Sequence, residues 1–334
     1  ASAQAGLEDT LATPRRIGDV QLVVAHVPAE DRDALLKLGD HVRDKLGEKG
    51  VVVLGAEWEG KATLLVTITA AVGYFMASRS GFFSVPGLVH TLIGTALVSA
   101  GANVLNQVLE RDADGRMVRT ANRPLPAGRV APEAAHVYGA VLGLGGVFYV
   151  AWFLNVTTAI LAAATLAAYV FVYTPLKRVT TLNTLVGAIP GALPPVGGWA
   201  AATGAVPREA WLLFLIVFLW QIPHFLAIAW LLRHDYVRGG FRMLTTVDPR
   251  GRSTGRHVAL GALALVPVSL APTLLGITGT AYFFGALGLG LAFTAVCLWM
   301  AWHPTDRRAR WVFFGSLFYL PALLAVMMVD KVPA

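Results

Sequence analysis

The stretch EAWLLFLIVFLWQIPHFLAIAWLL, residues 209–232, has a single charged residue, Glu209, and it stands at the first position. Gln221 and His224 are the two polar side chains that lie deep inside the otherwise apolar run. As a helix the stretch would be roughly 36 Å long, which is enough to cross the ~30 Å hydrocarbon core of a bilayer. It therefore predicts a membrane-spanning helix.

Similar apolar blocks recur from residue 62 onward. The predicted spans are nine, at residues 62–78, 86–109, 132–153, 156–174, 183–202, 209–232, 256–275, 279–302 and 311–329. Only 14% of the 334 residues are charged, whereas a soluble domain carries about a quarter. We expect an all-α polytopic membrane protein with nine transmembrane helices around a central cavity. The single cysteine, Cys297, excludes an internal disulfide and a cysteine-based zinc site.

The basic residues are distributed unevenly between the two sides of the predicted membrane protein. The loops after spans two, four, six and eight carry sixteen Lys and Arg residues, and the opposite loops with the C-terminus carry three. By the positive-inside rule, the N-terminus is cytoplasmic and the C-terminus lies outside. Because membrane topology accounts for the net charge of +7, we expect the lipid bilayer and no nucleic acid as a partner.

Residues 1–61 differ from the rest and predict a small soluble α/β segment. The pattern indicates strands at residues 20–27 and 51–54 and an amphipathic helix at residues 29–46. The runs VQLVV (20–24), DHVRDKLG (40–47) and VVVLG (51–55) resemble part of the C-terminal domain of alanyl-tRNA synthetases. We expect two domains, a non-catalytic segment at 1–61 and a membrane domain at 62–334.

The end of the second predicted span carries a regular series of polar residues. Asn106, Glu110 and Asp114 are spaced at i, i+4 and i+8, so that on a helix they share one face. Oxygen ligands at a membrane boundary suit Mg²⁺, which completes its octahedron with water and phosphate oxygens. The alternative is a charged helix end in solvent, which explains Asp112 well. It explains Asn106 poorly, because polar groups within the apolar zone are costly.

Basic side chains follow this series. Arg119 and Arg123 are one helical turn apart, and Lys177 with Arg178 stands in the next polar loop. Arginine binds diphosphate oxygens with forked hydrogen bonds, although membrane topology alone would also place cations here. The Gly- and Pro-rich run at residues 187–195 predicts a broken helix that lines a cavity.

The motifs resemble those of one enzyme family. The pattern Asn106-x₃-Glu110-x₃-Asp114, with its continuation RTANRPL (119–125), is similar to the first Asp-rich motif of UbiA-type prenyltransferases. The glutamate in the middle position resembles the heme o synthase branch. YTPLKR (173–178), GAIPGALPP (187–195) and WQIPHF (220–225) are similar to the same branch. Asp235-Tyr236-x₃-Gly240-x₂-Met243-Leu244 resembles its second motif, and the likeness covers residues 62–334.

This resemblance implies an activity and a set of site residues. The expected reaction transfers a farnesyl group from farnesyl diphosphate to a vinyl group of heme b, giving heme o for terminal oxidase assembly. The implied residues serve Mg²⁺ (Asn106, Glu110, Asp114 and Asp235), the diphosphate (Arg119, Arg123, Lys177 and Arg178) and heme (Gln221 and His224), with His224 also a catalytic candidate.

The same resemblance implies a bacterial inner-membrane location and a heme a synthase or oxidase assembly partner. Two other functions remain open. One is a related prenyltransferase that acts on an aromatic quinone precursor. The other is a membrane transporter, since broken helices and polar residues at mid-membrane depth occur there as well.

Overall fold

A computed structural model describes residues 15–17, 20–26, 50–55, 61–78 and 83–332, with the backbone alone for those up to 62. The chain divides into two compact units, residues 1–62 and 63–334. In the first unit, β1 (Arg15–Ile17) pairs antiparallel with β2 (Val20–His26), and β2 pairs parallel with β3 (Gly50–Gly55). The strands predicted at 20–27 and 51–54 are therefore present. The helix predicted at 29–46 lies outside the described residues.

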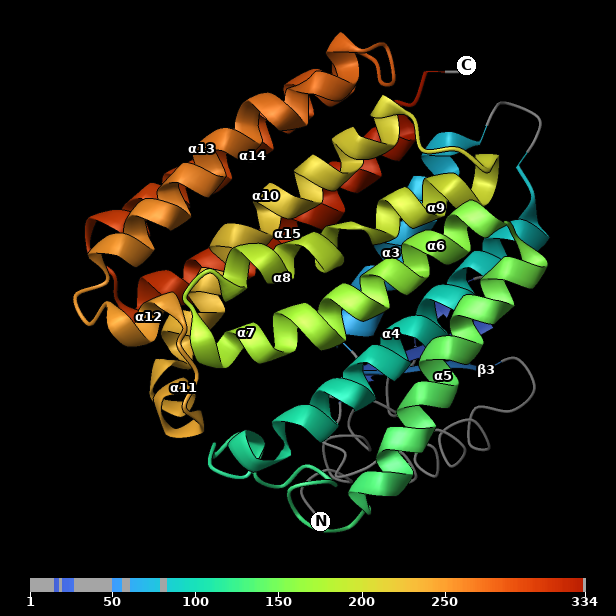
Figure 1. Cartoon of the computed structure of the whole chain (residues 1–334). Helices are drawn as coiled ribbons and strands as arrows, with labels where there is room; N and C mark the ends of the chain where they lie inside the picture. Colours follow the sequence, from blue (N-terminus) through green and yellow to red (C-terminus); the bar gives the residue numbers. More distant parts are fainter. Residues whose placement is uncertain (1–14, 18–19, 27–49, 56–60, 79–82, 333–334) are drawn as a thin grey trace. The chain divides into compact units, whose positions relative to one another are not determined.

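The second unit is built from helices (Figure 1). In chain order they are α3 (Lys61–Ala77), α4 (Val85–Asp114), α5 (Pro132–Phe153), α6 (Val156–Ala167), the π-helix η1 (Ala168–Tyr173), α7 (Thr174–Val179), α8 (Asn183–Ala192), α9 (Pro194–Thr203), α10 (Arg208–Leu231), α11 (Arg233–Gly239), α12 (Leu244–Val247), α13 (Arg252–Leu274), α14 (Thr280–Trp302) and α15 (Asp306–Val329).

Eight helical stretches among the described residues are long and apolar enough to cross a membrane, and they correspond to the second to ninth predicted spans. The protein is a multi-span membrane protein. The first predicted span is the 17-residue helix α3, which is shorter than the ~20 residues that a crossing needs. A ninth crossing at this position stays a prediction, as does the central cavity.

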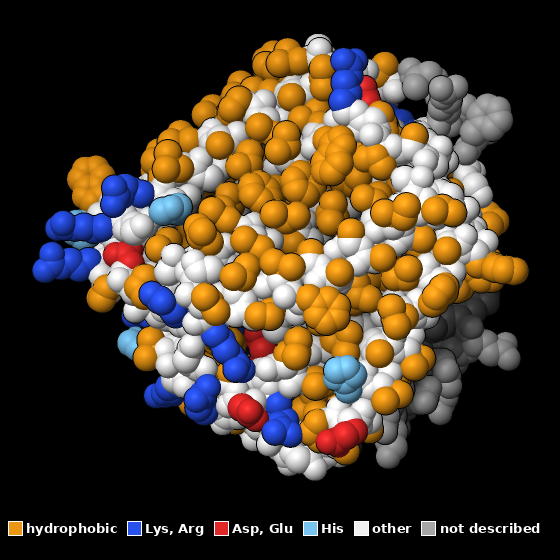
Figure 2. Space-filling view, viewed as in Figure 1, with side chains coloured by type: hydrophobic (Ala, Val, Ile, Leu, Met, Phe, Trp, Pro, Cys, Tyr) orange, Lys and Arg blue, Asp and Glu red, His pale blue; other side chains and the backbone are white. Residues whose placement is uncertain are grey.

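The surface of the second unit agrees with a lipid environment. Large apolar side chains point outward, among them Phe148 and Trp152 on α5 and Phe171 on η1, each more than 70% exposed. Figure 2 shows hydrophobic side chains over the middle of the visible face, with Lys and Arg gathered mainly along the left and lower edge. In Figure 1 that edge holds α11, α12 and the C-terminal end of α4. The charged loops thus collect at one end of the helices.

Helix α4 is longer than expected. Its start is capped by Ser84, whose Oγ accepts from the backbone N–H of Gly87 at 3.1 Å, and Pro86 suits the first turn. The predicted span ended at residue 109, whereas the helix continues to Asp114. The polar series of Asn106, Glu110 and Asp114 consequently lies on one unbroken helix.

The fifth predicted span is interrupted, as its Gly and Pro content predicted. Helix α8 ends at Ala192 and α9 begins at Pro194, because Pro194 and Pro195 have no backbone N–H for the helical ladder. Helix α3 packs closely on α9 through two glycines. A Cβ on Gly73 would lie 2.0 Å from the carbonyl oxygen of Pro195, and one on Gly198 would lie 1.9 Å from that of Ala70.

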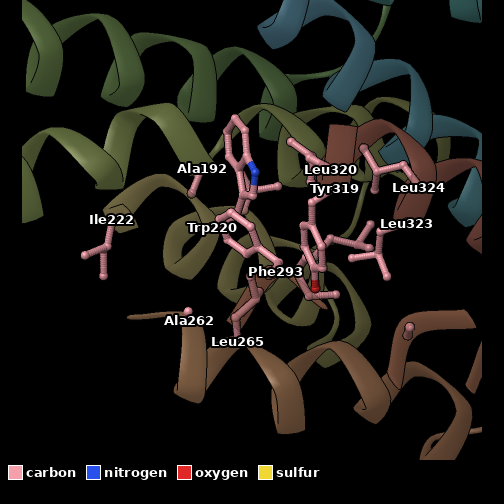
Figure 3. Packing of buried hydrophobic residues seen from close by; sticks show 14 of the residues in the cluster. Ala192, Trp220, Ile222, Ala262, Leu265, Phe293, Tyr319, Leu320, Leu323 and Leu324 are labelled. Carbon is pink, nitrogen blue, oxygen red and sulfur yellow. The ribbon is translucent and has the colours of Figure 1, made fainter. Parts of the chain in front are cut away.

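Helix α10 is the central element of the core and packs against α8, α9, α13 and α15. Trp220 on α10 is 1% exposed, and its indole Nε1 donates to the carbonyl oxygen of Ser316 on α15 at 2.8 Å. Figure 3 shows Trp220 among buried side chains that include Phe293 from α14 and Tyr319 from α15. This packing fixes α10 and α15 beside each other.

Candidate functional site

Three segments that are distant in sequence meet at one end of the second unit. They are the end of α4 with the loop after it, helix α7, and helix α11 with the residues that follow. Arg116 donates to the carbonyl oxygen of Gly239 at 3.0 Å, and the backbone N–H of Arg242 donates to that of Lys177 at 2.7 Å. Gly240 ends α11 with φ of 77°, a left-handed conformation that favours glycine and turns the chain back towards α7.

The polar series on α4 is buried. Asn106 is 8% exposed, Glu110 5% and Asp114 1%. By contrast, the Asp112 side chain is 78% exposed and pairs with the neighbouring Arg111. The reading as a charged helix end in solvent therefore holds for Asp112 and fails for the other three residues, which face the interior.

Each buried carboxylate is paired with a cation from outside α4, either Lys177 on α7 or Arg123 in the loop after α4. Lys177 Nζ lies 2.9 Å from Glu110 Oε1 and donates to Oε2 at 3.1 Å, and it also lies 4.5 Å from the ring centroid of Tyr173. Arg123 Nη1 donates to Asp114 Oδ2 at 2.6 Å. The structure thus brings together two candidate ligands for a metal and two candidate ligands for a diphosphate.

Two oxygens of the α4 series lack a hydrogen bond within the described part of the chain. Glu110 Oε1 is buried and accepts no hydrogen bond there, although Lys177 Nζ lies 2.9 Å from it as an ion-pair partner. Asn106 Nδ2 donates to Thr174 Oγ1 at 3.0 Å, and that hydroxyl in turn donates to the carbonyl oxygen of Tyr169 at 2.9 Å. Since this network fixes the amide orientation, Asn106 Oδ1 points away from Thr174 and stays available to a ligand.

These oxygens fit a magnesium ion in chemistry, since Mg²⁺ takes one or two carboxylates and completes its shell with water and phosphate. Across residues 63–78 and 83–332, no three Asp, Glu, His or Cys side chains lie close enough to hold a metal by themselves. The Asp235 carboxylate accepts from the backbone N–H of Arg119 at 3.4 Å and pairs with Arg238 at 3.5 Å. It therefore joins the loop after α4.

The other predicted residues take different positions. Arg119 is exposed, and Arg178 Nη2 donates to the carbonyl oxygen of Leu109 on α4 at 3.4 Å. Gln221 Nε2 donates to the carbonyl oxygens of Ala188 and Val217, both at 3.2 Å. His224 Nδ1 lies 2.7 Å from Ser316 Oγ on α15. Gln221 and His224 thus bond to different helices although they are three residues apart.

Several polar residues at the site have positions that sequence reasoning did not assign. Asn183 is fully buried and its amide donates to the carbonyl oxygens of Thr180 at 2.6 Å and of Arg242 at 2.9 Å, which joins α8 to the loop after α11. Thr174 orients Asn106, and Ser316 contacts His224. A polar residue within or at the end of an apolar span marks a possible functional position in the sequence. The sequence did not show which residue each one contacts, because the partners lie 59 to 92 residues away.

The sequence profile of the UbiA prenyltransferase family matches residues 65–320. The chain belongs to the UbiA prenyltransferase family. It is 45% identical over 280 residues to the protoheme IX farnesyltransferase of Solibacter usitatus (strain Ellin6076). The matched region covers 81% of this chain and 96% of that relative. The resemblance inferred from the motifs is therefore confirmed.

Solved structures of UbiA homologues share the fold. The apo structure of a homologue from Aeropyrum pernix K1 has a TM-score of 0.63 at 18% identity and covers 81% of this chain and 98% of that one. A homologue from Archaeoglobus fulgidus bound to GPP and Mg²⁺ has a TM-score of 0.59 at 15% identity and covers 80% of this chain and 96% of that one. The predicted helical membrane fold is therefore that of the UbiA family.

Proposed function

We propose that this protein transfers the farnesyl group of farnesyl diphosphate to a vinyl group of heme b and so forms heme o. The observation that carries the proposal is the pair of buried carboxylates, Glu110 and Asp114, which are paired with Lys177 on α7 and with Arg123 in the loop after α4. The curated relatives that match over most of the chain carry the name protoheme IX farnesyltransferase, which supports heme b as the acceptor.

Lys177 and Arg123 would bind the diphosphate of the substrate. In the structure they neutralise Glu110 and Asp114 at 2.9 and 2.6 Å, and phosphate oxygens are equally good partners for them. Arg119 and Arg178 lie at the exposed edge of the same segments and would extend the cationic surface towards solvent. Charge that develops on the leaving diphosphate is then met by side chains already held in place.

Asn106 and Glu110 would be the first to hold Mg²⁺, since Glu110 Oε1 accepts no hydrogen bond in the described residues and Asn106 donates through its nitrogen. Asp114 and Asp235, which do not form one metal-binding group with Glu110 in the described part of the structure, would act on the ion through water or phosphate oxygens. When bound, the ion lowers the charge on the diphosphate and makes it a better leaving group. The cations now paired with the carboxylates would pass to phosphate oxygens, so every buried charge keeps a partner.

The reaction then follows from the charges. The bond between C1 of the farnesyl chain and the diphosphate oxygen breaks, and the electron pair leaves with the diphosphate. The vinyl group attacks C1 and forms the new carbon–carbon bond, which leaves a cation beside the porphyrin. Water adds to that cation and loses a proton, giving the hydroxyethylfarnesyl substituent. Apolar side chains around the site would keep other nucleophiles away until then.

The charge distribution supports a cytoplasmic location for the site. The loops that hold Glu110, Lys177 and Asp235 are the arginine-rich ones, which the positive-inside rule assigns to the cytoplasm of a bacterial inner membrane. Heme o made here would pass to a heme a synthase or an oxidase assembly factor, because the product is a membrane-bound intermediate for terminal oxidases.

The test compares Asp114→Ala with Asp112→Ala in membranes supplied with heme b, farnesyl diphosphate and Mg²⁺. Both variants remove a carboxylate from the end of α4, but only Asp114 is buried and paired with Arg123. Product is measured by reversed-phase chromatography and mass, since heme o is more hydrophobic than heme b. We expect no heme o from Asp114→Ala and near-normal yield from Asp112→Ala.

Equal yields from the two variants would contradict the assignment of the α4 face. Wild-type protein that prenylates an aromatic quinone precursor but leaves heme b unchanged would retain the family chemistry and exclude heme as the acceptor. Wild-type protein that prenylates neither acceptor would contradict the proposed activity altogether.

A further inference from the structure

His224 is a buried polar residue of the core that the proposed diphosphate site does not use. It is on α10, 7% exposed, with its ring between those of Trp220 and Phe313. The ring centroids are 4.8 and 5.4 Å away, and the planes are inclined by only 20° and 27°. Two aromatic rings thus stack on the imidazole, and its nitrogens are left to interact through the ring edge.

The hydrogen bonds of Ser316 determine which nitrogen of His224 carries the proton. Ser316 Oγ lies 2.6 Å from the carbonyl oxygen of Phe313, and only the serine hydroxyl can supply the hydrogen for that contact. Ser316 Oγ can therefore only accept in its 2.7 Å contact with His224 Nδ1. The hydrogen sits on Nδ1, and Nε2 keeps its lone pair.

Nε2 has no partner among the residues that the structure describes. The one side-chain hydrogen bond of His224 there involves Nδ1, and its ring contacts are stacked with Trp220 and Phe313 and tilted with Phe225. An imidazole whose Nδ1–H donates to a protein oxygen while Nε2 offers a lone pair is the arrangement found in metal-ligating histidines. The backbone of Ser316 is held as well, because its carbonyl oxygen accepts from Trp220.

We propose that His224 Nε2 coordinates the iron of the heme substrate and that Ser316 is the positioning residue that fixes its tautomer and ring orientation. This inference rests on the proposed function. At 1.5 Å per residue, His224 lies about 10 Å from the end of α10 that is followed by Arg233. Heme bound there would have its iron inside the apolar span, with the basic end of the helix on the side that suits its propionates.

The experiment uses the full-length protein in detergent, titrated with ferric heme b and followed by absorption, with resonance Raman of the reduced complex. The wild-type protein is expected to show an imidazole-ligated heme. His224→Ala should lose that signature, and added imidazole should restore it. Ser316→Ala should keep an imidazole ligand but bind heme about 10- to 100-fold more weakly, with a shifted iron–histidine stretching frequency.

Ser269→Ala is the matched control. Ser269 is also fully buried in a membrane-spanning helix and donates to the carbonyl oxygen three residues before it, at 2.8 Å, but it does not contact a histidine. It should leave the heme spectrum unchanged. If Ser269→Ala shifted the iron–histidine stretching frequency as much as Ser316→Ala does, the shift would come from altered core packing in general. That result would overturn the positioning role of Ser316.

An unchanged heme spectrum in His224→Ala would exclude it as the ligand, even if the wild-type protein makes heme o. If the His224→Ala protein fails to insert into the membrane, the test rests on the iron–histidine stretching frequency of Ser316→Ala. An unchanged frequency in that variant overturns the proposal. A wild-type protein that binds heme through His224 but makes no heme o would contradict the proposed function and leave the ligand assignment standing.

Discussion

Replacing Lys177 by Met removes one partner of the ion pair with Glu110. The two side chains are 13% and 6% exposed, so the carboxylate would remain buried without its cation. Breaking a buried pair in this way costs about 3–5 kcal/mol, and we expect a value near the lower end, about 3 kcal/mol. For a membrane domain of about 270 residues that corresponds to a fall in Tm of roughly 5 °C. Farnesyl transfer should be lost as well.

The double variant Glu110→Gln/Lys177→Met separates stability from catalysis. With both charges gone, most of the lost stability should return, whereas activity should stay absent. Arg178→Met is the control for stability, since this neighbouring arginine is exposed and makes one 3.4 Å hydrogen bond to Leu109. Thermal unfolding in detergent and heme o yield are measured on the same preparations. A Lys177→Met protein as stable as wild type, or an active double variant, would refute the reasoning.

Three further predictions concern other parts of the protein. Activity should vanish in excess EDTA and return with Mg²⁺, and undiminished turnover without metal would exclude the proposed role of Asn106 and Glu110. Lys331 donates to the carbonyl oxygens of Phe75, at 2.7 Å, and Ser78 at the end of α3, so Lys331→Met should destabilise the protein by about 1–3 kcal/mol in thermal unfolding. Arg208→Met is the neutral control, because within the described part of the chain its exposed guanidinium pairs with Glu209 alone. Deleting residues 1–58 and placing Lys-Pro-Arg before Ala62 should preserve or improve heme o yield per inserted protein, and an inserted but inactive product would show that this segment is functional.

Hydropathy predicted the spans because a helix needs about twenty mostly apolar residues to cross the hydrocarbon core of the bilayer, whichever helices pack beside it. Spacing placed Asn106, Glu110 and Asp114 on one helix face, since a helix repeats within a few residues. Hydropathy did not predict where α4 ends. Four of the five residues at 110–114 are charged and fall outside the hydropathy-predicted span, but the helix continues through them, with Glu110 and Asp114 buried and paired with Lys177 and Arg123.

The amino-acid sequence by itself determined the membrane class, the helical spans, the family and most of the candidate residues, because these depend on composition and on local periodicity. Only the tertiary structure decided which cation neutralises which carboxylate and which nitrogen of His224 carries the proton. Lys177 is 67 residues from Glu110, and Ser316 is 92 from His224. Such pairs form when helices pack, and their hydrogen bonds depend on distances and angles that no local pattern contains.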